Sequence, residues 1–285
     1  MPGPLPLLMG VVNVTPDSFS DGGRWFDTDD GIAHGIALAD AGAAILDIGG
    51  ESTRPGAQRP EESEELRRTI PVIEALLEQP GMPPISIDTM RARVAAAAIE
   101  AGARVVNDVS GGLADPDMVR VLADAPDVDF VAMHWRGHSA DMQRRAVYGD
   151  VVREVRAELD ARVEQLVAAG IDPERIVLDP GLGFAKTAEH NWQLVGRLDE
   201  LVGRGYRVLI GASRKAFLGR LEAGADGTPA PPQAREAATA AITLLCAQAG
   251  VWCVRVHEIE PSRSALRVVG AVAAHAPDAG PGDRR

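Results

Sequence analysis

Aromatic side chains are scarce in this sequence of 285 residues, where phenylalanine, tryptophan and tyrosine together make up 4%. A core of ordinary size must therefore consist mainly of Ala, Val, Leu and Ile, which supply most of the 46% hydrophobic content. Aliphatic cores of this kind are typical of buried parallel strands covered by alanine-rich helices. At this length an α/β barrel commonly folds as a single unit.

Cysteines and long apolar runs are also rare. The two cysteines, Cys246 and Cys253, lie in the apolar stretches TLLCAQAG and VWCVRV, where we expect buried thiols rather than a disulfide. No stretch approaches the length that crosses a membrane, and the start, MPGPLPLLMG, lacks the charged region of a secretory signal. We therefore expect a cytoplasmic protein with no membrane partner.

Positive charge is in short supply, since 29 Lys and Arg residues face 41 Asp and Glu residues and the formal net charge is -12. A protein that binds nucleic acid normally presents a basic face, so we expect no nucleic-acid partner. A site for a small anion is not excluded, because a few well-placed cations and backbone amides are enough to form one.

Short apolar runs that end in small or polar residues recur along the chain and predict eight strands. The predicted strands are Leu7–Val12, Ala44–Ile48, Ile85–Asp88, Arg104–Asn107, Asp129–Met133, Arg175–Asp179, Arg207–Gly211 and Trp252–Val256.

Segments with helical spacing lie between these strands. The clearest are Gly31–Ala41, Arg91–Ala101, Val151–Ala169, Trp192–Val202 and Ala237–Ala249. Four helical patterns end in Ala-Gly just before a strand, and glycine adopts the left-handed conformation that ends a helix. Helix starts are indicated at Thr89 and at Asp115-Pro116.

Strands that alternate with helices through right-handed crossovers form a parallel sheet. A count of eight favours closure into a single (β/α)8 TIM barrel over an open doubly wound sheet. We expect residues 1–275 to form this domain and residues 276–285 to be a disordered tail. In such barrels the active site lies where the strands end. Polar residues stand at these ends: Asn13, Asp47, Asp88, Asn107, His134, Asp179, Ser213 and His257.

Two segments, MGVVNVTPDSFSDGG (Met9–Gly23) and DIGGESTRPGA (Asp47–Ala57), resemble the two signature segments of dihydropteroate synthases. The similarity continues through SIDT, VNDVSGG, MHW, LDPGLGFAKT, GASRKAF and RVH, in the expected order from the third strand to the eighth. This resemblance implies a pterin-binding barrel enzyme, a transferase of folate biosynthesis. It joins the methylene of a dihydropterin diphosphate to the amine of p-aminobenzoate and releases diphosphate.

A pterin presents an N–H and an exocyclic amine side by side, and one carboxylate can accept both hydrogen bonds. Asp179 is suited to this role, although alone it could equally cap a strand-end turn; Asp88 and Asn107 at matching strand ends favour the ligand role. The resemblance implies that Lys215 donates a hydrogen bond to the pterin. The full set of implied pterin-site residues is Asp88, Asn107, Val109, Met133, Asp179, Phe184, Gly211, Lys215 and Arg255.

The diphosphate needs positive charge and hydrogen-bond donors. Arg255 and His257 are two residues apart, so their side chains point to the same side of the last strand. The resemblance adds Asn13, Thr53 and Arg54, and implies that Asn13 helps to hold a Mg²⁺ whose remaining ligands are waters and phosphate oxygens. From the residues alone, Asn13 could instead satisfy backbone groups and His257 could be a solvated imidazole.

Two glycine- and proline-rich loops, Thr15–Gly23 and Glu51–Pro60, are expected at the same mouth. Their composition alone is typical of surface connections. By resemblance they complete the p-aminobenzoate site, lined by Phe19, Thr53, Pro55, Phe184 and Lys215. The implied catalytic residues are Asp21, Arg54, Lys215 and Arg255.

One residue departs from the family pattern. Where some members carry a Ser that helps to bind the p-aminobenzoate carboxylate, this chain has Ala216. Backbone amides at the start of a helix Lys215–Leu221 could replace it.

Other features have plainer interpretations. His34 and His190 lie on helical segments as surface or packing residues, and the acidic run Glu61–Glu65 indicates a solvated helix start.

Two other functions are compatible with parts of this sequence. A corrinoid-dependent methyltransferase would share Asp88, Asn107 and Asp179, but would lack both loops and the SRK–RVH pair. A non-catalytic relative would show broken loop motifs or would lack a Lys, Arg or His of the site. This chain keeps all of these residues, namely Asp21, Arg54, Lys215, Arg255 and His257. Sulfonamide inhibition and a homodimer are further expectations from the family.

Overall fold

The computed structural model describes residues 4–15, 26–51, 59–138, 142–221 and 223–275. Five predicted site residues lie outside them, as does the predicted tail at 276–285. These residues are Phe19, Asp21, Thr53, Arg54 and Pro55.

Eight parallel strands form a closed barrel in which each strand pairs with its neighbours in the sequence and the last pairs with the first. The strands are β1 (Leu7–Asn13), β2 (Ile45–Gly49), β3 (Ile85–Asp88), β4 (Val105–Asp108), β5 (Asp129–Met133), β6 (Ile176–Asp179), β7 (Arg207–Ile210) and β8 (Cys253–Val256). The TIM barrel is therefore confirmed, and every predicted strand end lies within one residue of the observed one.

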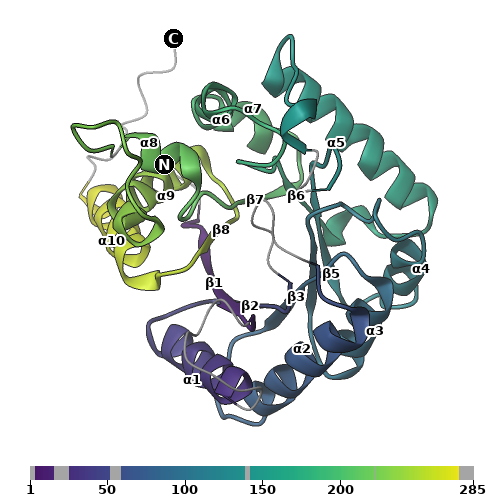
Figure 1. The fold of residues 1–285 in the computed structure, drawn as a ribbon. Helices are drawn as coiled ribbons and strands as arrows, with labels where there is room; N and C mark the ends of the chain where they lie inside the picture. Colours follow the sequence, from purple (N-terminus) through teal and green to yellow (C-terminus); the bar gives the residue numbers. More distant parts are fainter. Residues whose placement is uncertain (1–3, 16–25, 52–58, 139–141, 222, 276–285) are drawn as a thin grey trace.

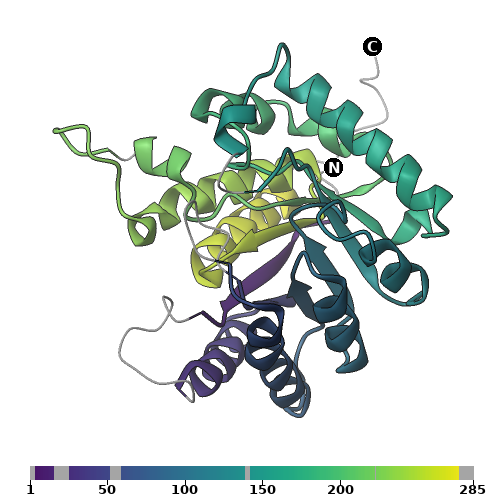
Figure 2. The same cartoon turned by 45° about the vertical axis from the view of Figure 1, so that its right-hand side comes forward.

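Helices surround the barrel on its outside (Figures 1 and 2). The α-helices are α1 (Phe26–Asp40), α2 (Glu62–Leu77), α3 (Ala92–Glu100), α4 (Met118–Ala123), α5 (Val151–Ala168), α6 (Ala188–Val195), α7 (Leu198–Val202), α8 (Ala216–Leu221), α9 (Glu236–Ala249) and α10 (Ile259–Ala274). The 3-10 helices are η1 (Met142–Arg145), η2 (Pro173–Arg175) and η3 (Pro232–Arg235).

The four Ala-Gly joints are confirmed as left-handed helix ends. Gly42, Gly102, Gly170 and Gly250 have φ angles of 99°, 112°, 92° and 78°. A side chain in this region clashes with the backbone, so glycine lets each helix stop and turn into the next strand.

The single helix predicted at Trp192–Val202 is wrong. The chain forms two helices there, α6 and α7, separated by Gly196 and Arg197. Helix α6 begins earlier than predicted because Thr187 and His190 form a reciprocal cap, in which each side chain accepts a hydrogen bond from the other residue's backbone amide at 3.2 Å. His190 is therefore a capping residue.

Three helix starts also differ from the predictions. Arg91 occupies the N-cap position of α3 without a capping hydrogen bond from its side chain, and Thr89 accepts a hydrogen bond from the Arg91 amide at 3.2 Å. Pro116 lies in a turn before α4, which begins at Met118. Helix α8 begins at Ala216, one residue after the predicted start.

The acidic run does begin a helix, α2, but the prediction that it is solvated is wrong for Glu65. This side chain is fully buried and accepts hydrogen bonds from Thr89 Oγ1 at 2.5 Å and from Arg91 Nη1 at 2.6 Å. Burial raises the pKa of Glu65, and the two donors oppose that rise. An ion pair across two elements takes the place of water here.

Two separate apolar cores hold the fold together. The larger lies between the strands and the helices, and the smaller takes one residue from each of seven strands: Met9, Ile45, Val105, Val131, Val177, Leu209 and Cys253. Because these seven contact one another rather than the helices, they fill the inside of the barrel. Both cysteines are buried and unpaired, as predicted.

This inner layer fixes where the polar residues lie. Side chains on a strand alternate between its two faces, so the residue two positions further on faces inward as well. On β2, β4, β6 and β8 those residues are Asp47, Asn107, Asp179 and Arg255. The apolar floor of the barrel therefore supports a polar layer at the carboxyl ends of the strands.

None of the helices in the described part of the chain has both the length and the apolar composition that crossing a bilayer requires.

Candidate active site

Arg255 is the centre of the polar layer. Its Nε donates to Asp47 Oδ2 at 2.5 Å, and its Nη2 donates to Asp88 Oδ2 at 2.7 Å. Asn107 Nδ2 donates to the same oxygen of Asp47 at 2.9 Å. Four strands, β2, β3, β4 and β8, thus contribute to one hydrogen-bonded network, which brings together three of the predicted site residues.

Asp47 was placed at a strand end by the sequence but given no role in the site. It is fully buried, and both of its described hydrogen bonds go to Oδ2, while Oδ1 has no partner in the described part of the structure. The charge of Arg255 compensates for this buried carboxylate. A charged residue within the apolar strand ILDIG was the signal in the sequence.

Asp88 shares Arg255 with Asp47. Burial raises the pKa of Asp88, Arg255 opposes the rise, and the nearby Asp47 carboxylate adds to it. Two carboxylates around one guanidinium leave this part of the site with an excess of acceptors. Such an arrangement suits a ligand that presents several N–H donors.

Asp179 ends β6 and is 6% exposed. Its Oδ1 accepts a hydrogen bond from the Gly181 amide at 2.7 Å, which fixes the orientation of the carboxylate. Burial raises the pKa of Asp179, and Lys215 is the largest influence against that rise. The capping interpretation is therefore correct for one oxygen, and each oxygen of the carboxylate still has acceptor capacity for a ligand.

Lys215 lies between Asp179 and the loop that follows β6. Its Nζ donates to the Leu182 carbonyl and lies 4.6 Å from the centre of the Phe184 ring. Burial lowers the pKa of Lys215 to about 8, although Asp179 favours the charged form. Gly211 leaves space here, since a Cβ on it would lie 3.9 Å from both Lys215 Nζ and Arg255 Cβ.

His257 follows β8 and is held by Ser213, which follows β7. The Ser213 hydroxyl accepts a hydrogen bond from the His257 amide at 3.2 Å and lies 3.0 Å from His257 Nδ1. His257 is half-buried. The ring is therefore oriented by a neighbouring strand, which fits a ligand role better than a freely solvated imidazole.

Asn13 ends β1 and is half-buried. Its amide oxygen lies beside Gly49, where an added Cβ would be 3.7 Å from Asn13 Oδ1 and 3.8 Å from Asp88 Oδ2. Hard oxygen atoms of this kind suit Mg²⁺. In the described part of the chain, no cluster of three or more His, Cys, Asp or Glu side chains could hold a metal. The Asn13 amide oxygen could supply one ligand to a magnesium ion whose other ligands are waters and phosphate oxygens.

The remaining predicted pterin residues lie at neighbouring strand ends. Met133 is buried at the end of β5 and pairs in register with Asp179. Val109 and Phe184 are half-buried and follow β4 and β6. Ala216 is exposed at the start of α8.

Two buried residues beside the site were not predicted to act in it. His134 and Lys186 are each 3% exposed, and Lys186 Nζ lies 3.0 Å from His134 Nδ1. The sequence signals were a histidine directly after an apolar strand and a lysine in the apolar run GLGFAK.

Comparison with known proteins agrees with this geometry. The family described as pterin binding enzyme matches residues 9–257. The chain is 57% identical over 265 residues to a dihydropteroate synthase of Mycobacterium leprae, covering 93% of this chain and 92% of that protein.

Two solved structures are similar over nearly the whole chain. One is the Xanthomonas albilineans dihydropteroate synthase with 4-aminobenzoic acid, with a TM-score of 0.86, 44% identity, and coverage of 95% of this chain and 94% of that one. The other is the Yersinia pestis dihydropteroate synthase with a sulfonamide drug complex, with a TM-score of 0.86, 37% identity and coverage of 95% of both chains. The chain therefore belongs to the pterin binding enzymes and, among them, to the dihydropteroate synthases.

Proposed function

We propose that this chain transfers the pterin methylene of 6-hydroxymethyl-7,8-dihydropterin diphosphate to the amine of p-aminobenzoate. The reaction releases diphosphate and serves tetrahydrofolate biosynthesis. The observation that carries the proposal is the convergence of Asp88, Asn107, Asp179, Lys215 and Arg255 at one mouth of the barrel, in a chain of this family.

Asp179 binds the edge of the pterin. One of its oxygens already accepts a hydrogen bond from Gly181, so the carboxylate is held in place before the ligand arrives. It accepts the pterin N–H and the exocyclic amine together. Because both bonds go to a charged acceptor, they are stronger than hydrogen bonds between neutral groups.

The remaining polar edges of the pterin meet Asp88, Asn107 and Lys215. Asn107 turns its amide nitrogen toward Asp47, so its amide oxygen faces the other way, toward a ligand. Lys215 exchanges its hydrogen bond with the Leu182 carbonyl for one with the pterin. Met133, Val109 and Phe184 pack against the ring.

Arg255 and His257 bind the departing diphosphate. A guanidinium can bond two phosphate oxygens at once and stays protonated throughout. Asn13 would hold a Mg²⁺ ion, which when bound would supply positive charge against the charge of the leaving group. Thr53 and Arg54, which lie outside the described residues, complete the diphosphate site.

The methylene C–O bond breaks first, because the conjugated pterin delocalises the developing positive charge. Arg255 stabilises the negative charge that appears on the departing oxygen. The amine nitrogen of p-aminobenzoate then forms a bond to the methylene carbon and loses one proton. Asp21, outside the described residues, stabilises the cation or accepts that proton. No enzyme nucleophile takes part.

Phe184 and Lys215 form the described part of the p-aminobenzoate site, and Phe19, Thr53 and Pro55 form the rest. We propose that backbone amides near the start of α8 bind the carboxylate, because Ala216 offers no hydroxyl group. Sulfonamides imitate p-aminobenzoate, so we expect them to compete for this site.

The direct test is formation of dihydropteroate from the pterin diphosphate and p-aminobenzoate, with Mg²⁺ present and then chelated. We expect product and diphosphate in equal amounts, and much less of both without Mg²⁺. Absence of product from folded protein with Mg²⁺ would rule out the proposed reaction. If chelation leaves the rate unchanged, the proposed role of Mg²⁺ is ruled out but the proposed reaction is not.

A homodimer is a further proposal. Leu245 on α9 and Val268 and Val272 on α10 are 42%, 55% and 67% exposed. These two helices pack side by side on the outside of the barrel (Figure 1). Exposed apolar side chains gathered on adjacent helices support contact with a second copy.

A further inference from the structure

The loop that joins β6 to α6, Pro180–Thr187, has an unusual backbone. Gly181, Gly183 and Ala185 have φ angles of 67°, 82° and 49°. Glycine adopts such angles without a steric clash, whereas the Cβ of an alanine makes them unfavourable. An alanine persists in this conformation only where surrounding contacts hold it.

Two side chains hold the loop on either side of Ala185. Lys186 Nζ donates to the Phe184 carbonyl at 3.1 Å, and the Tyr148 hydroxyl donates to the Ala185 carbonyl at 3.0 Å. The first of these bonds holds the backbone of Phe184, whose ring belongs to the proposed pterin site. The loop also begins directly after Asp179.

Lys186 makes a second hydrogen bond, to His134, which directly follows β5. The other ring nitrogen, Nε2, lies 2.9 Å from Glu158 Oε2 on α5 and donates to it, because a carboxylate only accepts. Burial lowers the pKa of His134 to about 4, so the ring is neutral and Nδ1 is its acceptor. Nδ1 therefore accepts from Lys186 at 3.0 Å.

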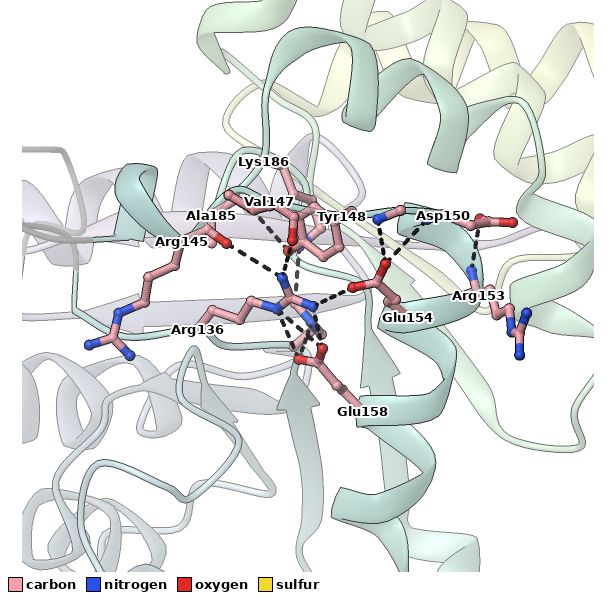
Figure 3. Close-up of polar contacts among 12 residues, drawn as sticks. Arg136, Arg145, Val147, Tyr148, Asp150, Arg153, Glu154, Glu158, Ala185 and Lys186 are labelled. Atoms are coloured by element: carbon pink, nitrogen blue, oxygen red, sulfur yellow. Dashed lines mark hydrogen bonds and ion pairs between the residues drawn. The ribbon is translucent and has the colours of Figure 1, made fainter.

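Arg136 fixes the far end of this chain of contacts. Figure 3 shows its guanidinium between Glu154 and Glu158, which both come from α5. It also lies 3.9 Å from the centre of the Tyr148 ring, so both residues that hold the loop are bound to one cluster. The cluster is anchored to α5 through Glu154 and Glu158.

We propose that Lys186 and His134 form a positioning pair that holds the loop Pro180–Thr187, and through it Asp179 and Phe184, in the geometry that binds the pterin. The inference rests on the proposed function and deepens it. Neither residue is among the proposed pterin contacts, so the pair acts by positioning the residues that are. The pair acts on the complex with the bound substrate before the reaction, so its loss weakens pterin binding more than it slows turnover.

The pair also affects the protonation of Asp179. Lys186 faces Asp179 at the end of β6, Lys215 in the loop after β7, Arg136 in the segment after β5 and Glu158 on α5. It contacts His134, which follows β5, directly. Burial lowers the pKa of Lys186 to about 7, while Asp179 favours its charged form. When charged, Lys186 lowers the pKa of Asp179.

The first test replaces Lys186 with methionine (Lys186→Met), which keeps the length of the side chain but removes its charge and donors. We expect KM for the pterin diphosphate to rise about tenfold and kcat to change less than about threefold, the effect of losing one or two buried hydrogen bonds. The acid limb of kcat/KM for the pterin should move to higher pH, because Asp179 becomes easier to protonate.

The second test compares two variants of His134. His134→Gln can donate to Glu158 and accept from Lys186, so it should keep pterin KM within about threefold of wild type. His134→Leu can do neither and should resemble Lys186→Met. This comparison decides the matter even if Lys186→Met does not fold.

Arg207→Met is the control for stability. It removes a two-point ion pair with Asp129, at 2.7 Å for each bond, at the opposite mouth of the barrel. It should lower the thermal midpoint without changing pterin KM or the acid limb.

The inference fails if Lys186→Met or His134→Leu keeps the wild-type pterin KM, or if His134→Gln is as impaired as His134→Leu. A wild-type enzyme that makes no dihydropteroate would overturn the proposed function instead. Calorimetric titration with the pterin diphosphate would then still test the positioning pair, because it requires no turnover.

Discussion

Arg255 makes ion pairs with two buried carboxylates from different strands, Asp47 and Asp88. A buried charge of this kind costs desolvation free energy that only its partners offset. Arg255 therefore has two roles at the scale of a single residue. It compensates for the carboxylates, and we propose that its remaining N–H groups bind the diphosphate.

Asp179→Asn tests the residue on which pterin recognition depends most. Asparagine can still accept from the Gly181 amide, so the fold should hold, but it offers one acceptor where the pterin presents two donors. We expect pterin affinity to fall about 100-fold in calorimetry, with a nearly unchanged thermal melt.

Asp129→Asn is the matched control, since this carboxylate pairs with Arg207 at the other mouth of the barrel. It should leave pterin affinity unchanged. A wild-type pterin affinity in Asp179→Asn would contradict the assignment, and a collapsed melt would indicate a structural role.

At the scale of secondary structure elements, β5 and α5 are joined by the contact between His134 and Glu158. Helix α5 begins where the Asp150 side chain accepts from the amides of Val152 and Arg153, both at 3.1 Å. This cap fixes the start of the helix and so the position of Glu158, two turns further along. The site thus depends on a helix that contributes no ligand to it.

The burial of His134, which lowers the pKa of the ring against the opposing influence of Glu158, predicts a loss of stability in acid. The folded-state pKa of His134 is about 4, below its ordinary value of 6.5, so the unfolded chain binds more protons between these values. Its contribution is present above pH 6.5 and is lost as the pH falls toward 4, by about 3 kcal/mol in all.

Chemical denaturation at several pH values would measure this loss. His134→Gln has no group that titrates in this window, so its free energy of unfolding should fall less steeply between pH 6.5 and 4. Equal slopes for the variant and the wild type would show that other groups cause the loss.

At the scale of the whole molecule, the exposed apolar side chains of α9 and α10 predict a dimer. Sedimentation equilibrium should give twice the 30.1 kDa mass of the chain. Val272→Lys places a charge among these side chains and should shift the equilibrium toward the monomer, because burying an unpaired charge is unfavourable.

Val167→Lys on α5, at a valine that is 40% exposed, controls for the added charge and should remain dimeric. A monomeric wild type would contradict the proposal. A dimer that survives Val272→Lys would place the interface elsewhere on the molecule.

The barrel closes because its last strand returns to its first, with Leu7 paired to Cys253. Closure brings Arg255 beside Asp47 and Asp88, which are 208 and 167 positions away in the sequence. All the strands are parallel, so all their carboxyl ends meet at one mouth. The whole fold is therefore needed to assemble the site.

The sequence by itself determined the strands, the glycine-ended helices and the strand-end positions of Asp88, Asn107 and Asp179. These features depend on local rules, namely the two-residue alternation of a strand and the left-handed freedom of glycine. The family motifs added the roles proposed for these residues. Local rules were weaker where a cap competed with periodicity, as at Thr187 and His190.

Only the tertiary structure decided which of these side chains meet. The buried Glu65, the role of Asp47 and the pair formed by Lys186 and His134 all depend on partners from other elements. A sequence pattern shows that a charged residue lies in an apolar run, but not which residue compensates for it. That choice is made by packing, because a buried polar group is tolerated only where the fold brings it a partner.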